Sequence, residues 1–237
     1  LVHTEKVTAW QEIAQRMAHE IKNPLTPIKL SAQRILKKFK TDPDSIGTIL
    51  EPAVDAIIME VENLTQLLSQ FKDFARMPSP VKENIRLKSL VSEVSLLYSE
   101  SYSRISLDSK GLDDIQLKGD KGQLQRVFSN LISNSFESIT GEGTVIIKSE
   151  LIRKGETHYC RIMITDTGHG IDPDMKELIF TPYFTTKTGG TGLGLPIVER
   201  IITDHQGIIW HESELEVGTT FFIELPMEDT HEQHSDN

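Results

Sequence analysis

The sequence predicts an α+β protein in which a helical hairpin precedes an α/β sandwich. Two stretches near the start, about residues 4–40 and 50–71, carry apolar residues at alternating spacings of three and four, the pattern of helices that pack along a seam. A proline-containing break at residues 76–80 then ends the second helix. Beyond it, runs of β-forming residues alternate with helical patterns, which indicates a sheet covered by helices.

The first part should form two long helices joined by a turn at residues 41–45. Pro24 and Pro27 lie inside the first helix and should kink or loosen it just after His19, because each removes a backbone donor. One hairpin cannot cover both apolar seams, so we expect two copies to pair as a four-helix bundle in a homodimer.

The second part should mix short strands with helices, and the chain should end in a polar, acidic and disordered tail. The expected domains are residues 1–77, residues 78–227 and the tail 228–237. The expected helices are residues 87–102, 120–139 and 193–203, and the expected strands are residues 105–107, 115–117, 144–152, 158–166, 208–211 and 219–225.

Composition excludes several functional classes. The net charge of −10 and the lack of a basic stretch argue against nucleic-acid binding. No apolar stretch is long enough to span a membrane and no signal peptide is visible, so we expect a cytoplasmic region without direct membrane contact. The single cysteine, Cys160, fits an inert core thiol in a reducing compartment. The chain begins with Leu1 rather than Met, which is compatible with a fragment that has lost any sensor or membrane-anchoring region upstream.

The first helix carries a group of side chains suited to chemistry. With Val7 and Ala14 on the seam, His19 falls on the opposite side and should face water, with Glu20 beside it and Asn23 one turn later. A neutral imidazole nitrogen is a competent nucleophile near neutral pH. A plain surface histidine is the simpler reading of His19 alone. A zinc-protease motif is improbable because it needs a second histidine where Asn23 stands.

Two further clusters suit nucleotide binding. Asn130 and Asn134 lie one turn apart on a predicted helix, where their amide oxygens could hold Mg²⁺ beside phosphates. Asp166 ends a predicted strand, and a carboxylate there can accept a hydrogen bond from the exocyclic amine of adenine. Gly168 and Gly170 let the backbone pass close to a flat base. Taken alone, the asparagine pair is better explained as capping or solvated residues, and a simple turn is the alternative for the segment after Asp166.

A glycine-rich run at residues 189–196 opens the next predicted helix, with Pro196 in its first turn. A glycine-rich turn that leads into a helix start is an anion site, and Lys187 can add positive charge. The run matches neither the dinucleotide fingerprint nor the phosphate-loop pattern. A mobile surface loop is the alternative. Residues 216–221 form a turn into a strand that could close the pocket, or an ordinary hairpin.

In combination these motifs resemble those of the sensor histidine kinases, and most closely the NtrY/NtrB-like nitrogen-regulation branch. The resemblance covers the chain from His3 to Pro226. The H, N, G1, F and G2 boxes of that family correspond in order to residues 19–25, 130–137, 166–170, 180–184 and 190–194.

The resemblance implies a dimerisation and phosphotransfer hairpin followed by a gyrase-like ATP-binding domain. His19 would accept the γ-phosphoryl group of ATP, Glu20 would act as base or orienting carboxylate, and Asn23 would orient water for dephosphorylation of the regulator. Asn134, with Asn130, would hold Mg²⁺. Residues 172–191 would form the ATP lid. The nucleotide-binding residues would be Asn130, Asn134, Asp166, Gly168, Gly170, Lys187, Gly190, Gly192, Leu193, Gly194 and Thr220.

The implied reaction passes the phosphoryl group from His19 to an aspartate of a response-regulator receiver domain, and the linker at residues 77–81 should allow the two domains to move. Glu137 stands where many sensor kinases carry a basic residue. A dimeric docking module that mainly dephosphorylates the regulator, with ATP as effector, is the alternative. A gyrase-like ATPase is disfavoured because it would need a carboxylate base in place of Asn130.

Overall fold

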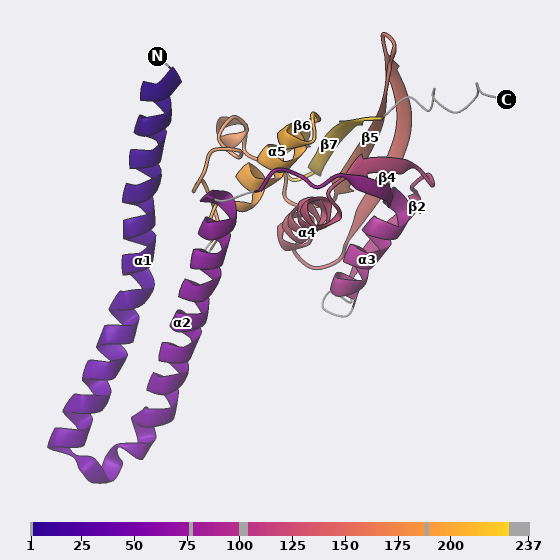
Figure 1. The fold of residues 1–237 in the computed structure, drawn as a ribbon. Helices are drawn as coiled ribbons and strands as arrows, with labels where there is room; N and C mark the ends of the chain where they lie inside the picture. The colour runs from indigo at the N-terminus through magenta and orange to yellow at the C-terminus, as the bar shows by residue number, and fades with distance from the viewer. Residues whose placement is uncertain (1, 76–77, 100–103, 188–189, 228–237) are drawn as a thin grey trace. The chain divides into compact units, whose positions relative to one another are not determined.

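The chain falls into two compact units. The computed structural model describes residues 2–75, 78–99, 104–187 and 190–227. The first unit comprises residues 1–77 with 187–193, and the second comprises residues 78–186 with 194–237. Most of the first unit is helical, whereas the second combines helices with two sheets (Figure 1).

The helical unit is a hairpin of two long helices, α1 (Val2–Thr41) and α2 (Gly47–Ala75), joined by one 3-10 turn (Pro43–Ser45). Asp42 closes the turn because its carboxylate accepts hydrogen bonds from Lys38 Nζ, at 2.8 Å, and from the Ser45 hydroxyl. Both predicted helices are present, and α2 begins slightly earlier than its apolar pattern indicated.

Helix α1 remains helical through Pro24 and Pro27. Pro27 cannot donate to the Asn23 carbonyl, which is the acceptor of an ordinary residue at its position. Nearby, the Thr26 hydroxyl donates a supplementary hydrogen bond to the Lys22 carbonyl at 3.1 Å. The prolines therefore remove donors without ending the helix.

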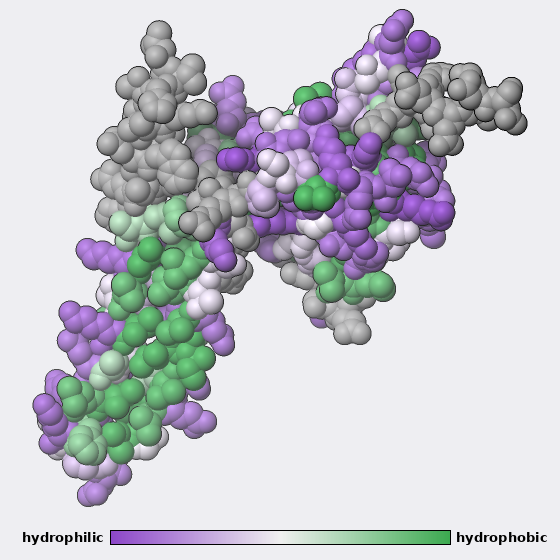
Figure 2. Space-filling model, viewed as in Figure 1, coloured by the Kyte–Doolittle hydropathy of each residue, from purple (hydrophilic) through white to green (hydrophobic). Residues whose placement is uncertain are grey.

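A single hairpin leaves much of its apolar surface in water. Met17, Ala53 and Leu67 are buried, yet Leu30 is 60% exposed and Ile58 is 50% exposed. Figure 2 shows the apolar residues as a green surface along the hairpin. The large apolar residues exposed on the two helices are Leu25, Leu30, Leu36, Phe39, Leu50, Val54, Ile58, Met59, Val61 and Leu68.

The second unit is built on a five-stranded mixed sheet with the order β2-β4-β5-β7-β6. Strands β2 and β4 run parallel, and each remaining neighbouring pair is antiparallel. The strand bounds are β2 (Ile105–Gly111), β4 (Gly143–Lys154), β5 (Thr157–Asp166), β6 (Ile208–Glu214) and β7 (Gly218–Pro226).

Three helices cover one face of this sheet: α3 (Leu87–Ser99), α4 (Lys121–Ser138) and α5 (Gly194–Asp204) (Figure 1). The strands bury alternate residues against them, as a sheet with one covered face requires. On β5 the buried residues are Cys160, Ile162, Ile164 and Asp166. Burial, with a smaller effect of the Asp113 charge, raises the pKa of the Cys160 thiol to about 12, which agrees with an inert core thiol.

A second, two-stranded sheet pairs β1 (Glu83–Arg86) with β3 (Gln116–Gly119). The sequence did not predict β1, because only Ile85 of its four residues is buried and so short a strand carries no periodicity. Just before it, the Pro78 carbonyl accepts a hydrogen bond from Gln123 Nε2, and the Val81 N–H donates to Asp120 Oδ2, both at 3.0 Å. The linker that we expected to move is therefore tied to α4 from Pro78 onward.

The predicted fold class, a helical hairpin followed by an α/β sandwich, is confirmed. Each predicted strand and helix of the second part is present, although the last residues of the predicted helix 87–102 and the tail 228–237 lie outside the described residues. Within the described part of the chain, none of the helices combines the length and apolar character needed to cross a membrane.

Candidate functional site

Four side chains form a row across one face of the main sheet. The strand register pairs Val145 with Asp166, Asp166 with Thr219, and Thr219 with Ser213. Cross-strand partners project to the same face of a sheet. Since Val145 is fully buried beneath the helices, Asp166, Thr219 and Ser213 lie on the helix-covered face.

The Asp166 carboxylate is held by one of its two oxygens. Its Oδ1 accepts hydrogen bonds from Gly168 N–H at 2.9 Å and Thr219 N–H at 3.3 Å, and the Ser138 hydroxyl lies 3.3 Å away. Among the described residues, no hydrogen bond ends at Oδ2. A carboxylate fixed in this way keeps a second acceptor for a ligand N–H.

The loop after Asp166 requires glycine at two positions. A Cβ on Gly168 would lie 2.0 Å from Ser138 Oγ, and a Cβ on Gly170 would lie 2.1 Å from the Glu214 carbonyl oxygen. Gly170 also adopts φ +71°, a conformation that favours glycine. The loop thus passes tightly between the end of α4 and the β6–β7 turn.

The same register separates two adjacent threonines. Thr219 pairs with Asp166, whereas Thr220 pairs with Thr165. The hydroxyl oxygens of Thr165 and Thr220 lie 3.0 Å apart. Successive residues of a strand point to opposite faces. Thr220, which the resemblance placed among the nucleotide-binding residues, therefore lies on the face opposite Asp166, and the threonine beside Asp166 is Thr219.

The two predicted asparagines lie on α4. Asn130 Nδ2 donates to the Arg126 carbonyl at 2.8 Å. Its Oδ1 lies only 2.9 Å from where a Cβ on Gly194 would stand, so this oxygen faces the first residue of α5. Asn134 is half-buried one turn later on α4. Glu137 is exposed on the same helix and accepts a hydrogen bond from the Ser133 hydroxyl at 2.7 Å.

The glycine-rich segment leads into the N-terminus of α5, as predicted. The Gly190 N–H donates to the Lys187 carbonyl at 3.2 Å, and Gly192 adopts φ +63°. Leu193 is fully buried, and α5 starts at Gly194. Unpaired N–H groups at a helix start attract phosphate oxygens. Residues 188–189 lie outside the described part of the chain.

The start of the predicted lid is fastened to β6 through Ser213. The Ile171 N–H donates to Ser213 Oγ at 2.8 Å, and Lys176 Nζ donates to the Ser213 carbonyl at 2.5 Å. His211 stands next to Phe180 and Phe221, with ring centroids about 6 Å away. Burial, and secondarily the charge of Lys176, lowers the pKa of His211, so this imidazole is neutral near neutral pH.

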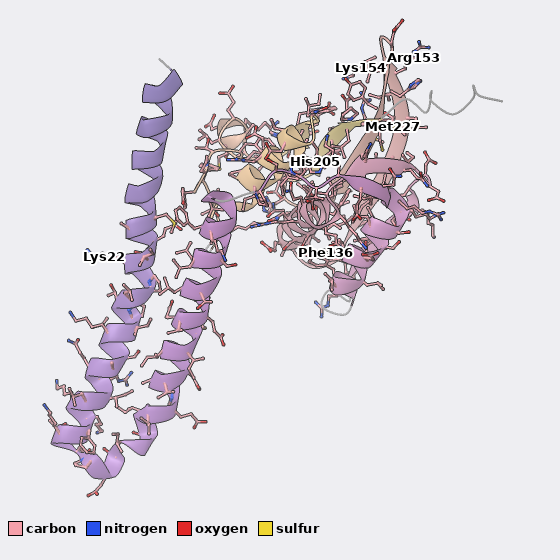
Figure 3. All side chains as sticks on the ribbon, in the orientation of Figure 1. Lys22, Phe136, Arg153, Lys154, His205 and Met227 are labelled. Carbon is pink, nitrogen blue, oxygen red and sulfur yellow. The ribbon has the colours of Figure 1, made fainter. Side chains whose placement is uncertain are left out.

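A second hydrogen-bonded group joins the ends of α4 and α5. Asp120 caps α4 by accepting from the Gln123 N–H at 3.0 Å. Buried His205, labelled in Figure 3, follows α5 directly. Its Nε2 accepts from the Asp120 N–H at 2.9 Å, and its Nδ1 lies 2.7 Å from the Ile201 carbonyl. The sequence analysis did not single out His205 or Asp120.

The candidate phosphoacceptor group lies in the other unit. His19, Glu20 and Asn23 all fall within the continuous helix α1. Glu20 is half-buried and Asn23 is exposed, one turn after His19. The water-facing orientation of the His19 side chain stays a prediction, because that side chain lies outside the description. In the described residues, no cluster of three or more His, Cys, Asp or Glu side chains could hold a metal ion.

The structure brings Ser138, Ser213 and Thr219 to the predicted Asp166, and of these only Thr219 lay in a stretch singled out from the sequence, residues 216–221. Serine and threonine carry little chemical signal in a sequence, and their proximity depends on strand register. The sequence offered one signal. Thr219 and Thr220 directly follow the turn residue Gly218, so in a strand that begins there the two threonines must lie on opposite faces, and only one of them can lie beside Asp166.

Both parts of the chain match protein-family models. Residues 9–80 match the His Kinase A (phospho-acceptor) domain. Residues 119–229 match the family described as histidine kinase-, DNA gyrase B-, and HSP90-like ATPase.

Individual relatives agree with the family matches. The nitrogen regulation protein NtrY of Azorhizobium caulinodans is 32% identical over 214 residues, which are 87% of this chain but 27% of that protein. Histidine kinase ThkA, in a crystal structure with response regulator protein TrrA, has a TM-score of 0.73 and 28% identity, and the match covers 95% of this chain and 64% of that chain. Full-length ShkA in complex with AMPPNP has a TM-score of 0.64 and 25% identity, over 92% of this chain and 46% of that chain.

Proposed function

We propose that this chain, which belongs to the sensor histidine kinase family, is the catalytic region of an ATP-dependent protein-histidine kinase. In this proposal His19 receives the γ-phosphoryl group of ATP and passes it to an aspartate of a response regulator. The observation that carries the proposal is the Asp166 carboxylate, held at Oδ1 and without a hydrogen bond at Oδ2 among the described residues. It lies in the part of the chain that matches the ATPase family.

At the adenine end, Asp166 Oδ2 would accept a hydrogen bond from the exocyclic amine of the base. Gly168 and Gly170 let the loop lie close to α4 and to the β6–β7 turn, which fixes the backbone that follows Asp166. The AMPPNP complex of ShkA supports a nucleotide as the ligand of this fold.

At the phosphate end, the N-terminus of α5, the backbone amides of Gly190, Gly192, Leu193 and Gly194, and the Lys187 ammonium would neutralise the phosphate charge. Mg²⁺ would be held by Asn134, with Asn130, together with the phosphates. The donor set fits this ion, because Mg²⁺ keeps several waters and takes few protein ligands beside phosphates. When bound, the ion would neutralise charge on the phosphate oxygens.

The acceptor would be a neutral ring nitrogen of His19. It would attack the γ-phosphorus while the bond to the bridging oxygen of the leaving ADP breaks, so that a P–N bond replaces a P–O bond. Glu20 would orient the ring or take its proton, and Asn23 would orient water when the regulator is dephosphorylated. The match of residues 9–80 to a phospho-acceptor domain supports this assignment.

The partners would be a second copy of the chain and a receiver domain. The exposed apolar surface of α1 and α2 supports dimerisation through the hairpin. The complex of ThkA with a response regulator supports the second partner. Because ATP is the phosphoryl donor, the proposal assigns the reaction to the cytoplasm.

The test is incubation of the purified chain with γ-labelled ATP and Mg²⁺. The proposal expects label on the protein that is labile to acid and stable to base, as phosphohistidine is. Acid-stable label, or ATP binding without any label, would contradict it. The second outcome would favour the regulator-docking module instead.

A further inference from the structure

The Ser213 hydroxyl has three hydrogen-bond partners near Asp166, which occupy its proton and both of its lone pairs. Ser213 Oγ accepts from the Ile171 N–H at 2.8 Å, lies 3.0 Å from the Gly218 carbonyl oxygen, and lies 2.9 Å from Thr219 Oγ1. A serine hydroxyl has one proton to donate and two lone pairs to accept with. These three neighbours therefore use its whole capacity.

The direction of each bond follows from the neighbours. A carbonyl oxygen can only accept, so the Ser213 proton goes to Gly218. An N–H can only donate, so Ile171 occupies one lone pair of Ser213. The bond between Ser213 and Thr219 must then use the proton of Thr219. The Thr219 hydroxyl can therefore only accept a hydrogen bond from any further partner.

The consequence reaches Asp166 because the two residues are neighbours in the register. Thr219 is buried beside a carboxylate whose Oδ2 has no hydrogen bond among the described residues. For a base bound at Asp166, the carboxylate oxygen and the threonine oxygen, whose proton is committed to Ser213, would both be acceptors. Two acceptors attract an amine and repel a carbonyl group.

We propose that Ser213 is a positioning residue that sets the purine specificity of this site, by committing the Thr219 proton and so favouring a 6-amino purine over a 6-oxo purine. The inference rests on the proposed function, in which the base binds at Asp166. Ser213 itself would not touch the base. It would act by orienting the Thr219 hydroxyl and by holding the Ile171 N–H, where the loop after Asp166 ends.

The test compares the affinities of ADP and IDP, which are not phosphoryl donors for His19 and differ in carrying an amine or a carbonyl group at purine C6. Calorimetry on the full chain with Mg²⁺ should show that the parent prefers ADP. In Ser213→Ala the Thr219 proton is released to donate to a carbonyl. The preference, measured as the ratio of the two Kd values, should then fall by about fivefold, the worth of one neutral hydrogen bond.

The matched control is Thr165→Val, which removes a hydroxyl from β5 on the opposite face of the sheet. Its ratio of the Kd values for IDP and ADP should equal that of the parent. The ratio for Ser213→Thr, which keeps the hydroxyl, should also equal that of the parent. A purely structural role of Ser213 would weaken ADP and IDP alike and leave the ratio unchanged, which would overturn the inference while ATP binding stands. A parent chain that binds neither nucleotide would instead remove the proposed function.

Discussion

The imidazole of His205 accepts a hydrogen bond from the backbone N–H of Asp120, with 2.9 Å between Nε2 and the nitrogen. His205 follows the helix that starts at the glycine-rich segment, and Asp120 caps the helix that carries both asparagines. One buried side chain therefore joins the C-terminal end of α5 to the N-terminus of α4. Because Nδ1 lies 2.7 Å from the Ile201 carbonyl, the tautomer with the proton on Nδ1 satisfies both bonds.

Replacement of His205 by alanine should destabilise the second unit. The change leaves a cavity and removes the partners of a buried N–H and a buried carbonyl, which together should lower the free energy of unfolding by about 3 kcal/mol. Urea unfolding of the full chain, followed by circular dichroism, measures the effect. The exposed His158→Ala variant is the control and should change stability by less than about 0.5 kcal/mol. Equal midpoints for both variants would contradict this role of His205.

Asp120 should make stability depend on pH in the acid range. Burial alone would raise its pKa, but hydrogen bonds from the backbone N–H groups of Gln123 and Val81 outweigh burial and lower the pKa below that of an ordinary aspartate. A carboxyl whose pKa is lowered by folding contributes its full stability above the pKa of the unfolded chain, near 3.9. That contribution is lost as the pH falls through the folded pKa.

The Asp120→Asn variant isolates this contribution. Asparagine can still cap α4 but cannot accept from both Gln123 and Val81, so the variant should be less stable than the parent by about 1 kcal/mol at pH 7. The difference should shrink as the pH falls below the pKa of the unfolded chain and through the lowered folded pKa, because the parent carboxyl is then protonated. A difference that stays constant over this range would show that the Asp120 charge does not contribute.

Asp166→Asn should weaken nucleotide binding. The amide replaces the carboxylate that accepts from Gly168, Thr219 and, in the proposal, the adenine amine. Loss of a charge-assisted hydrogen bond should raise the Kd for ADP by about 10- to 100-fold. Asp108→Asn is a suitable control, because within the described part of the chain Asp108 on β2 accepts only a local hydrogen bond from the Lys110 N–H. Unchanged affinity in Asp166→Asn would remove Asp166 from the base site.

His19→Ala should abolish phosphorylation of the chain without loss of ADP binding, because His19 is not among the residues proposed to hold the nucleotide. Label transfer from γ-labelled ATP and ADP calorimetry on the same preparation test both halves of this statement. His158→Ala, which removes an exposed histidine from the second unit, should label like the parent. Loss of ADP binding in His19→Ala would contradict the division of labour.

Ile58→Glu should weaken dimerisation. Ile58 is half exposed on α2 in the single chain, within the apolar surface that a second copy would cover. A carboxylate buried at such an interface costs several kcal/mol unless it is paired. Sedimentation should therefore show a dimer for the parent and a shift toward monomer for the variant. Asn63→Glu, on the opposite side of α2, should remain dimeric. A monomeric parent at micromolar concentration would overturn the dimer itself.

Much of this architecture is readable from the sequence because long, periodic elements dominate it. The apolar spacing of α1 and α2, and the alternation along β4 and β5, each extend over ten residues or more. Strand β1 fails this test, since it has four residues and one buried side chain. Helix α1 continues through both of its prolines, and the kink expected there stays a prediction.

The site was only partly predictable for a different reason. Asp166 stood out because a carboxylate followed by two glycines is chemically distinctive. Ser213 lies 47 positions away from it in the sequence (213 − 166 = 47), and only the pairing of β5, β7 and β6 brings them together. Thr220 stays a prediction, but the register places Thr219 beside Asp166 and Thr220 on the opposite face, because one residue along a strand reverses the face.

The attachment of Pro78 and Val81 to α4 decides where this protein can be cut and rejoined. A chimera with a foreign helical hairpin should keep its junction upstream of Pro78, so that residues 78–81 still present the Pro78 carbonyl to Gln123 and the Val81 N–H to Asp120. A flexible insertion in such a chimera should likewise be placed before Pro78. There it does not disturb the hydrogen bonds at the first turn of α4, the helix that carries Asn130.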